Sequence, residues 1–110
     1  MSTLSTHVLD TAHGRPAAGI ALTLSQADGA VLFTGQTNDD GRCPELPALD
    51  AGHYQLSFAV ADYFRGAGVV LADPPFLNVI AIDFGVAANG GHYHVPLLVA
   101  PYGYSTYRGS

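Results

Sequence analysis

The sequence predicts an all-β domain, either a sandwich or a barrel, with one short helix. Apolar and polar residues alternate in short runs, as they do along half-buried strands. Turn-forming residues interrupt these runs about every eight to twelve positions, a spacing typical of sandwiches and barrels. One segment, 61–65, suits a short helix instead. We therefore expect about seven or eight strands, mostly antiparallel.

The N-terminal half holds three predicted strands. The first alternates strictly, so that Leu4 lies on a core face and His7 on the opposite face. A loop with glycine and proline ends this strand. The next two strands are joined by Asp28-Gly29, a pair typical of a tight hairpin turn, and an Asn-Asp-Asp-Gly turn follows them. These strands are expected at residues 3–10, 20–26 and 31–37.

The C-terminal half holds four further predicted strands and the helix. The first of these strands passes directly into the helix, which two nearby glycines end. An Asp-Pro-Pro loop then precedes a strongly apolar strand. An Asn-Gly-Gly turn and a Pro-Tyr-Gly turn lead into the last two strands. The four strands are expected at residues 54–60, 76–84, 92–100 and 104–108.

Length and charge limit the possible partners. The chain has 110 residues and a net charge of −5, and its four positive charges are all arginine. This length fits a single domain, 1–110. The chain has no basic patch to neutralise phosphates, so we expect no nucleic acid and no polybasic contact with a membrane. Charged residues make up only 12% of the chain, which suggests that part of the surface is buried in an oligomer.

The termini and the single cysteine indicate the compartment. The longest apolar stretch, 95–101, is far shorter than the ~20 residues that a membrane helix needs. The first residues lack the basic and apolar regions of a signal peptide. Cys43 is alone, so it forms no disulfide within the chain and no cysteine zinc cluster. A cytoplasmic protein is expected.

His92-Tyr93-His94 is the most informative local pattern. On a strand, Tyr93 and Val95 share the core face, whereas His92 and His94 point to the other side. Pro96 has no N–H to give to a sheet, so it marks an edge, a bulge or a solvent-facing site. The two histidines can be surface residues, metal ligands together with His7, or an acid–base pair in a pocket.

Two other features are ambiguous when each is taken alone. His7 can be a surface histidine of a strand, and Arg42, after the Asn-Asp-Asp-Gly turn, can be a solvated loop arginine. The chain ends with Tyr107-Arg108-Gly109-Ser110 directly after a strand. Such an end either frays or is held in an interface.

Together, these motifs resemble the transthyretin-like family. The opening segment 4–10, the Gly-Arg-Pro-Ala segment 14–17 and Thr-Asn-Asp-Asp-Gly-Arg at 37–42 look like its first strand, loop and turn. The segment 92–97 and the ending 101–110, with its terminal Tyr-Arg-Gly-Ser, are similar to the family's enzyme branch, which hydrolyses 5-hydroxyisourate. The hormone-carrying branch lacks both the histidines and this ending.

The resemblance implies a sandwich of two four-stranded, mostly antiparallel sheets with one short helix. It also implies a homotetramer, a dimer of dimers, with sites in the channel where the dimers meet. The implied reaction is hydrolysis of 5-hydroxyisourate to 2-oxo-4-hydroxy-4-carboxy-5-ureidoimidazoline, without a metal or organic cofactor. The family's site positions fall on these residues: His7, Arg42, His94, Tyr107, Arg108, Gly109 and Ser110.

These residue types suit the opening of a cyclic amide. His7 and His94 both point out of the predicted core, where one imidazole can take a proton from water and the other can orient it or return a proton. Arg42 suits a urate-like ring edge and the developing oxyanion. Tyr107 and Ser110 would complete the wall that faces the substrate. The alternatives are a carrier of small ligands on the same scaffold and a zinc hydrolase that uses His7, His92 and His94.

Overall fold

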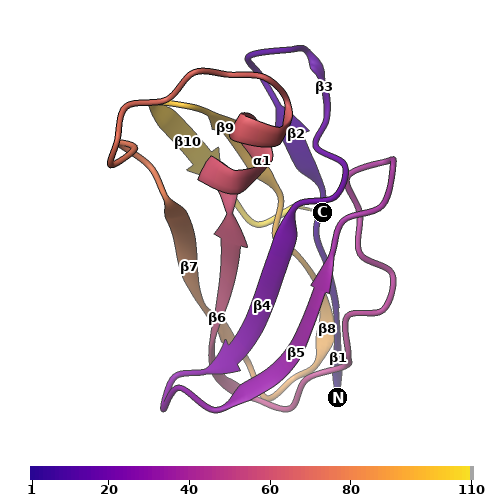
Figure 1. Cartoon of the computed structure of the whole chain (residues 1–110). Helices are drawn as coiled ribbons and strands as arrows, with labels where there is room; N and C mark the ends of the chain where they lie inside the picture. Colours follow the sequence, from indigo (N-terminus) through magenta and orange to yellow (C-terminus); the bar gives the residue numbers. More distant parts are fainter. Residues whose placement is uncertain (110) are drawn as a thin grey trace.

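Ten short strands and one helix make up the computed structural model, which describes residues 1–109 (Figure 1). The elements are β1 (Ser2–Ser5), β2 (Val8–Asp10), β3 (Arg15–Pro16), β4 (Ala21–Gln26), β5 (Val31–Gln36), β6 (Gly52–Ala59), α1 (Val60–Gly66), β7 (Val79–Val86), β8 (Gly91–His94), β9 (Leu97–Ala100) and β10 (Gly103–Thr106).

The strands form two four-stranded sheets and one separate pair. One sheet has the order β5-β4-β6-β7 and is antiparallel throughout. The other has the order β10-β9-β2-β3, in which β2 and β9 run parallel. The pair consists of β1 and β8, which are also parallel. The prediction of mostly antiparallel strands is confirmed, with these two exceptions, and the two-stranded pair was not expected.

Two of the predicted strands are each divided in two. The expected strand 3–10 is interrupted at Thr6 and His7, and the expected strand 92–100 is interrupted at Val95 and Pro96. Pro96 cannot donate to a ladder, which agrees with the irregularity expected there. At the break, the Thr6 hydroxyl donates to the carbonyl of Val95 at 2.7 Å. The β1-β8 pair ends at this junction and the β2-β9 pair begins after it. His7 and His94 therefore lie where one pair passes into the other.

The later elements shift at their boundaries. The helix is present where it was expected, at Val60–Gly66. The strand predicted at 76–84 begins only at Val79. Phe76 is instead 71% exposed and stacks against Tyr102, with ring centroids 5.9 Å apart. The last strand, predicted at 104–108, is also shorter and ends at Thr106.

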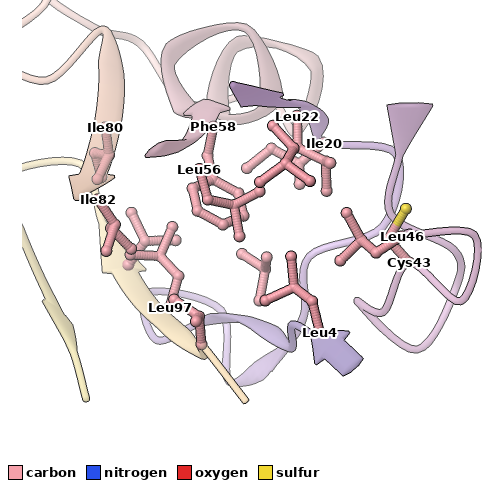
Figure 2. Packing of buried hydrophobic residues seen from close by; sticks show 14 of the residues in the cluster. Leu4, Ile20, Leu22, Cys43, Leu46, Leu56, Phe58, Ile80, Ile82 and Leu97 are labelled. Carbon is pink, nitrogen blue, oxygen red and sulfur yellow. The ribbon is translucent and has the colours of Figure 1, made fainter. Parts of the chain in front are cut away.

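The hydrophobic core draws on both four-stranded sheets and on the β1-β8 pair. Figure 2 shows Leu56 and Ile82 of one sheet close to Leu97 of the other, with Leu4 of β1 beside them. The predicted core face of the histidine segment is confirmed, because Tyr93 and Val95 are buried together with Leu97 and Val99. Burial of this apolar surface is the main force that holds the layers together. Cys43 is buried at the edge of the same cluster.

A buried carboxylate fastens β2 to the helix. Asp10 is 1% exposed and accepts hydrogen bonds from the Tyr63 hydroxyl at 2.8 Å and from Nδ1 of His13 at 2.6 Å. The backbone N–H of His13 donates to the same carboxylate at 3.0 Å. Burial by itself would raise the pKa of Asp10, but the hydrogen bonds from Tyr63 and His13 outweigh it and lower the pKa. Within residues 1–109, no helix has the length and apolar character of a membrane span.

Candidate active site

His7 and Arg42 lie opposite each other across a short stretch of antiparallel backbone. They are paired residues in an isolated bridge outside the named strands. Next to this bridge, the backbone N–H of Val8 donates to the carbonyl of Gly41 at 2.8 Å. On its other side, His7 accepts a hydrogen bond at its carbonyl from Leu97, at 3.0 Å. The chain therefore brings together two site residues that are 35 positions apart in the sequence.

Gly41 makes this approach possible. Its φ of +76° lies in the left-handed region, which residues with a Cβ rarely adopt. A Cβ at this position would also collide with the carbonyl oxygen of Val8. The glycine of the Asn-Asp-Asp-Gly turn therefore lets the loop run close to the chain at His7, and the next residue is Arg42.

His94 lies at the end of β8, between Ser5 and Gly109. Ser5 is its neighbour in the β1-β8 register, and the Ser5 hydroxyl lies 2.7 Å from Nδ1 of His94. On its other side, the carbonyl of His94 accepts a hydrogen bond from the N–H of Gly109 at 2.8 Å. His94 is half-buried, as is His7. Nδ1 is engaged, and among residues 1–109 no hydrogen-bond partner is found for Nε2.

The surroundings of His94 favour its neutral form. Burial is the largest cause, and the Arg42 guanidinium, His92 and His7 add to it, so the pKa of His94 is lowered from its ordinary value of 6.5. Two of the residues that lower the pKa of His94, His7 and Arg42, are the pair joined by the backbone bridge. A neutral imidazole with a free nitrogen is a suitable proton acceptor near neutral pH.

Neither of the two arginines in the site motifs is neutralised within the described part of the chain. Among residues 1–109, ion pairs are found for Arg65, with Asp62, and for His13, with Asp10, but not for Arg42 or Arg108. Arg42 is exposed to solvent. An unneutralised guanidinium beside a half-buried histidine provides a binding point for an anionic or oxygen-rich ligand.

The C-terminal residues occupy the other side of β8. Arg108 stacks its guanidinium on the ring of Tyr93, 4.3 Å from the centroid, and Nη2 donates to the carbonyl of His92 at 3.4 Å. Tyr107 and Arg108 line a hollow of about 240 Å³ with Tyr93, and His7, Arg42 and His94 are not among its lining residues. Within this chain, Gly109 adjoins His94 through a backbone bridge. Ser110 lies outside the described residues.

The geometry does not match the zinc hypothesis. No three histidine, cysteine or acidic side chains in the range 1–109 are arranged to hold a metal ion. His92 contacts hydroxyl groups through both ring nitrogens, Thr3 at 2.6 Å and Ser5 at 2.8 Å. Thr3 and Ser5 were not singled out from the sequence. Strand alternation could have identified these two residues, because it places both on the same face as His7.

Comparison with known proteins places the chain in a family. The sequence model described as the HIUase/Transthyretin family matches residues 4–109. The 5-hydroxyisourate hydrolase of Ralstonia nicotianae is 55% identical to this chain, over the full length of both. The structure of the Klebsiella pneumoniae 5-hydroxyisourate hydrolase superposes with a TM-score of 0.85 and 40% identity, covering 100% of this chain and 94% of that one.

A second solved structure, that of an (S)-allantoin synthase, has a TM-score of 0.91 and 39% identity to this chain. The similarity covers 99% of this chain but only 44% of that protein, so the chain spans less than half of the allantoin synthase. The family match and the full-length relatives agree with each other. The chain belongs to the HIUase/Transthyretin family.

Proposed function

We propose that this chain hydrolyses 5-hydroxyisourate to 2-oxo-4-hydroxy-4-carboxy-5-ureidoimidazoline, a step of urate degradation. The observation that carries the proposal is the pairing of His7 with Arg42 beside His94, an imidazole whose pKa is lowered. The full-length similarity to a protein named 5-hydroxyisourate hydrolase supports the same substrate. No cofactor takes part in the proposed reaction.

The imidazole of His94 acts first as a base and then as an acid. Its Nε2 takes one proton from a water molecule while the water oxygen bonds to a carbonyl carbon of the substrate ring. The carbon–nitrogen bond of that amide then breaks, and His94 returns the proton to the leaving nitrogen. One water is consumed, and His94 ends in its starting form. His7, opposite Arg42, orients the attacking water.

Arg42 supplies the positive charge of the reaction. The tetrahedral intermediate carries a negative oxygen, and a guanidinium that has no carboxylate partner within residues 1–109 can stabilise it. The planar group also matches the oxygen-rich edge of a urate-like ring. We assign Tyr107, Arg108 and Gly109 to substrate binding on the family resemblance, and the backbone bridge of Gly109 with His94 supports the assignment for Gly109. Ser110 is assigned to the same wall of the site on the family resemblance.

The proposed assembly is a homotetramer. Tyr102, Tyr104 and Tyr107 expose large rings along and beside β10, which is an edge strand. An exposed edge strand with aromatic side chains is suited to contact with a second copy. Arg42 is solvent-exposed in the single chain, and a second copy that covers Arg42 would close the site. Light scattering after gel filtration should give about four times the chain mass of 11.4 kDa.

We propose further that residues 1–110 form one domain, in which the two four-stranded sheets pack as a sandwich. The single core cluster, which includes residues of both sheets, supports this organisation. The unpaired Cys43 is compatible with the reducing cytoplasm, the proposed location.

A direct assay tests the function. Urate oxidase generates 5-hydroxyisourate from urate, and ultraviolet absorbance then follows its decay with and without this protein. The proposal expects faster decay with the protein, unchanged by a chelator. A carrier on the same scaffold would instead bind a small aromatic ligand tightly and leave the decay rate at its spontaneous value. Activity that a chelator abolishes would favour a metal-dependent hydrolase.

A further inference from the structure

A chain of four polar side chains runs along the outer face of the β1-β8 pair and ends at His94. Thr3 pairs with His92 and Ser5 with His94 in the parallel register. Because the side chains of a strand alternate, all four lie on one face, opposite Leu4 and Tyr93. The distances are 2.6 Å from Thr3 Oγ1 to His92 Nδ1, 2.8 Å from Ser5 Oγ to His92 Nε2, and 2.7 Å from Ser5 Oγ to His94 Nδ1.

The donors and acceptors of this chain depend on one another. The Ser5 hydroxyl has a single proton, so at least one of the two imidazoles must donate to it, and within residues 1–109 no acceptor other than these two rings is found for that proton. A neutral imidazole has one N–H and one acceptor nitrogen. If His94 donates from Nδ1 to Ser5, the Ser5 proton is available to Nε2 of His92, and His92 then donates from Nδ1 to Thr3. In the reverse arrangement, Nε2 of His94 carries the proton and cannot receive one from water.

We propose that Ser5 and His92 are positioning residues that hold His94 in the Nδ1–H tautomer, with Nε2 unprotonated and available to the substrate. This inference rests on the proposed function, in which Nε2 of His94 takes a proton from water. The hydrogen bond between Ser5 and Nδ1 also restricts rotation of the His94 ring. Nε2 has no such bond within residues 1–109 and stays available. In this proposal, Ser5 and His92 act on the reaction only through His94.

The charges around His94 are consistent with this role. Arg42, His92 and His7 are the groups whose charges act on it, and all three disfavour a protonated His94. Arg108 contacts the carbonyl of His92 but lies on Tyr93, on the other side of β8. No carboxylate of residues 1–109 forms an ion pair with His94. Within residues 1–109, a hydroxyl followed by a second imidazole therefore stands at Nδ1 of His94, where an aspartate orients the histidine of a Ser-His-Asp triad.

Kinetics of variants test the positioning role. Ser5→Ala should lower kcat about 10–100-fold and leave KM nearly unchanged, the size of effect seen when a group that orients a functional histidine is removed. His92→Ala should lower kcat about tenfold. Ser5→Thr keeps the hydroxyl and should restore most of kcat. Ser25→Ala on β4 and His53→Gln on β6 are the matched controls, since both side chains lie outside the network, and they should retain wild-type kcat.

Nitrogen NMR of the histidine rings provides a readout that does not depend on turnover. In the wild-type protein, Nδ1 of His94 should carry the proton and Nε2 should show the chemical shift of an unprotonated ring nitrogen. In Ser5→Ala, this tautomer should lose its preference, while His53→Gln should leave the His94 signals in place.

Either of two outcomes would overturn the inference. They are an Nε2–H tautomer of His94 in the wild-type protein, or a folded Ser5→Ala variant with full kcat. If Ser5→Ala does not fold, the nitrogen NMR spectrum of the wild-type protein still tests the tautomer of His94. Failure of the proposed function is distinguishable, because the wild-type protein would then not accelerate the decay of 5-hydroxyisourate, whatever its His94 tautomer.

Discussion

The imidazole of His94 fills the space that a side chain at Gly109 would need. A Cβ built at Gly109 would lie 3.0 Å from Cγ of His94 and still closer to the edge of the ring. The two residues are also joined by backbone, with the N–H of Gly109 donating to the carbonyl of His94 at 2.8 Å. The C-terminal segment therefore passes close to the imidazole, and a residue with a Cβ could not approach it so closely.

Gly109→Ala should displace the His94 ring and lower kcat/KM at least about tenfold, since small misplacements of a reacting group are costly. Gly103→Ala is the matched control, because a Cβ there meets no heavy atom within 4 Å. The urate oxidase-coupled assay measures both. Equal activity of the two variants would show that the ring does not depend on this contact.

His94→Ala should lower kcat on the order of 10²–10⁴-fold, because it removes the group that moves the proton. His53→Ala, a change of an exposed histidine on β6, is the control and should keep full activity. Circular dichroism establishes that both variants are folded. Unchanged turnover of folded His94→Ala would remove His94 from the mechanism.

Arg42→Lys should lower activity although the charge is kept, since an ammonium does not reproduce the planar fork of a guanidinium. Arg42→Gln should cost on the order of 10²–10³-fold in kcat, as the loss of an oxyanion donor does. Arg65→Gln, on the exposed surface of α1, is the control for loss of one positive charge. Steady-state kinetics on all three variants test the assignment, and wild-type rates for Arg42→Gln would contradict it.

Activity should fall on the acidic side of the pH profile only below pH 6.5. Burial lowers the pKa of His94 from 6.5, and Arg42, His92 and His7 lower it further. A base works when unprotonated, so activity persists as the pH drops through 6.5 and is lost as it passes the lowered pKa. The profile of kcat/KM measures this limb. A midpoint above 6.5 would mean that another group limits the reaction.

Asp10→Ala should lower the free energy of unfolding by about 1–3 kcal/mol at pH 7, because the Tyr63 hydroxyl and the His13 ring lose a buried acceptor. Asp83→Ala, at an exposed position of β7, should change it by less than about 0.5 kcal/mol. Urea unfolding measures both. Equal losses in the two variants would show that the buried carboxylate contributes nothing specific.

The same carboxylate predicts an acid sensitivity. The folded state lowers the pKa of Asp10 below its ordinary value of 3.8. Its contribution to stability is therefore complete above the unfolded pKa and is lost as the pH falls through the folded pKa. Wild-type stability should decline below about pH 4 more steeply than that of Asp10→Ala. Parallel declines in the two proteins would assign the acid sensitivity to other groups.

Alternation along the chain was enough to predict the faces of most strands. Leu4 and Val8 are buried while His7 is not, and Tyr93 is buried between His92 and His94, as the period of two requires. The short helix was also predictable, because glycines at positions 66 and 68 mark its C-terminal end. Strand ends were less predictable, and Phe76 is an example. Its apolar side chain fits a strand, but it contacts Tyr102 in a loop instead.

Residue types and local periodicity thus determined the all-β class, the outward direction of His7 and His94, and the resemblance to a family. Tertiary structure alone decided which residues meet. The bridge of His7 with Arg42, the fit of the His94 ring against Gly109 and the hydroxyl of Ser5 between two imidazoles all join segments far apart in the sequence. Local preferences act over a few residues, whereas these contacts depend on how the strands are ordered and in which register they pair.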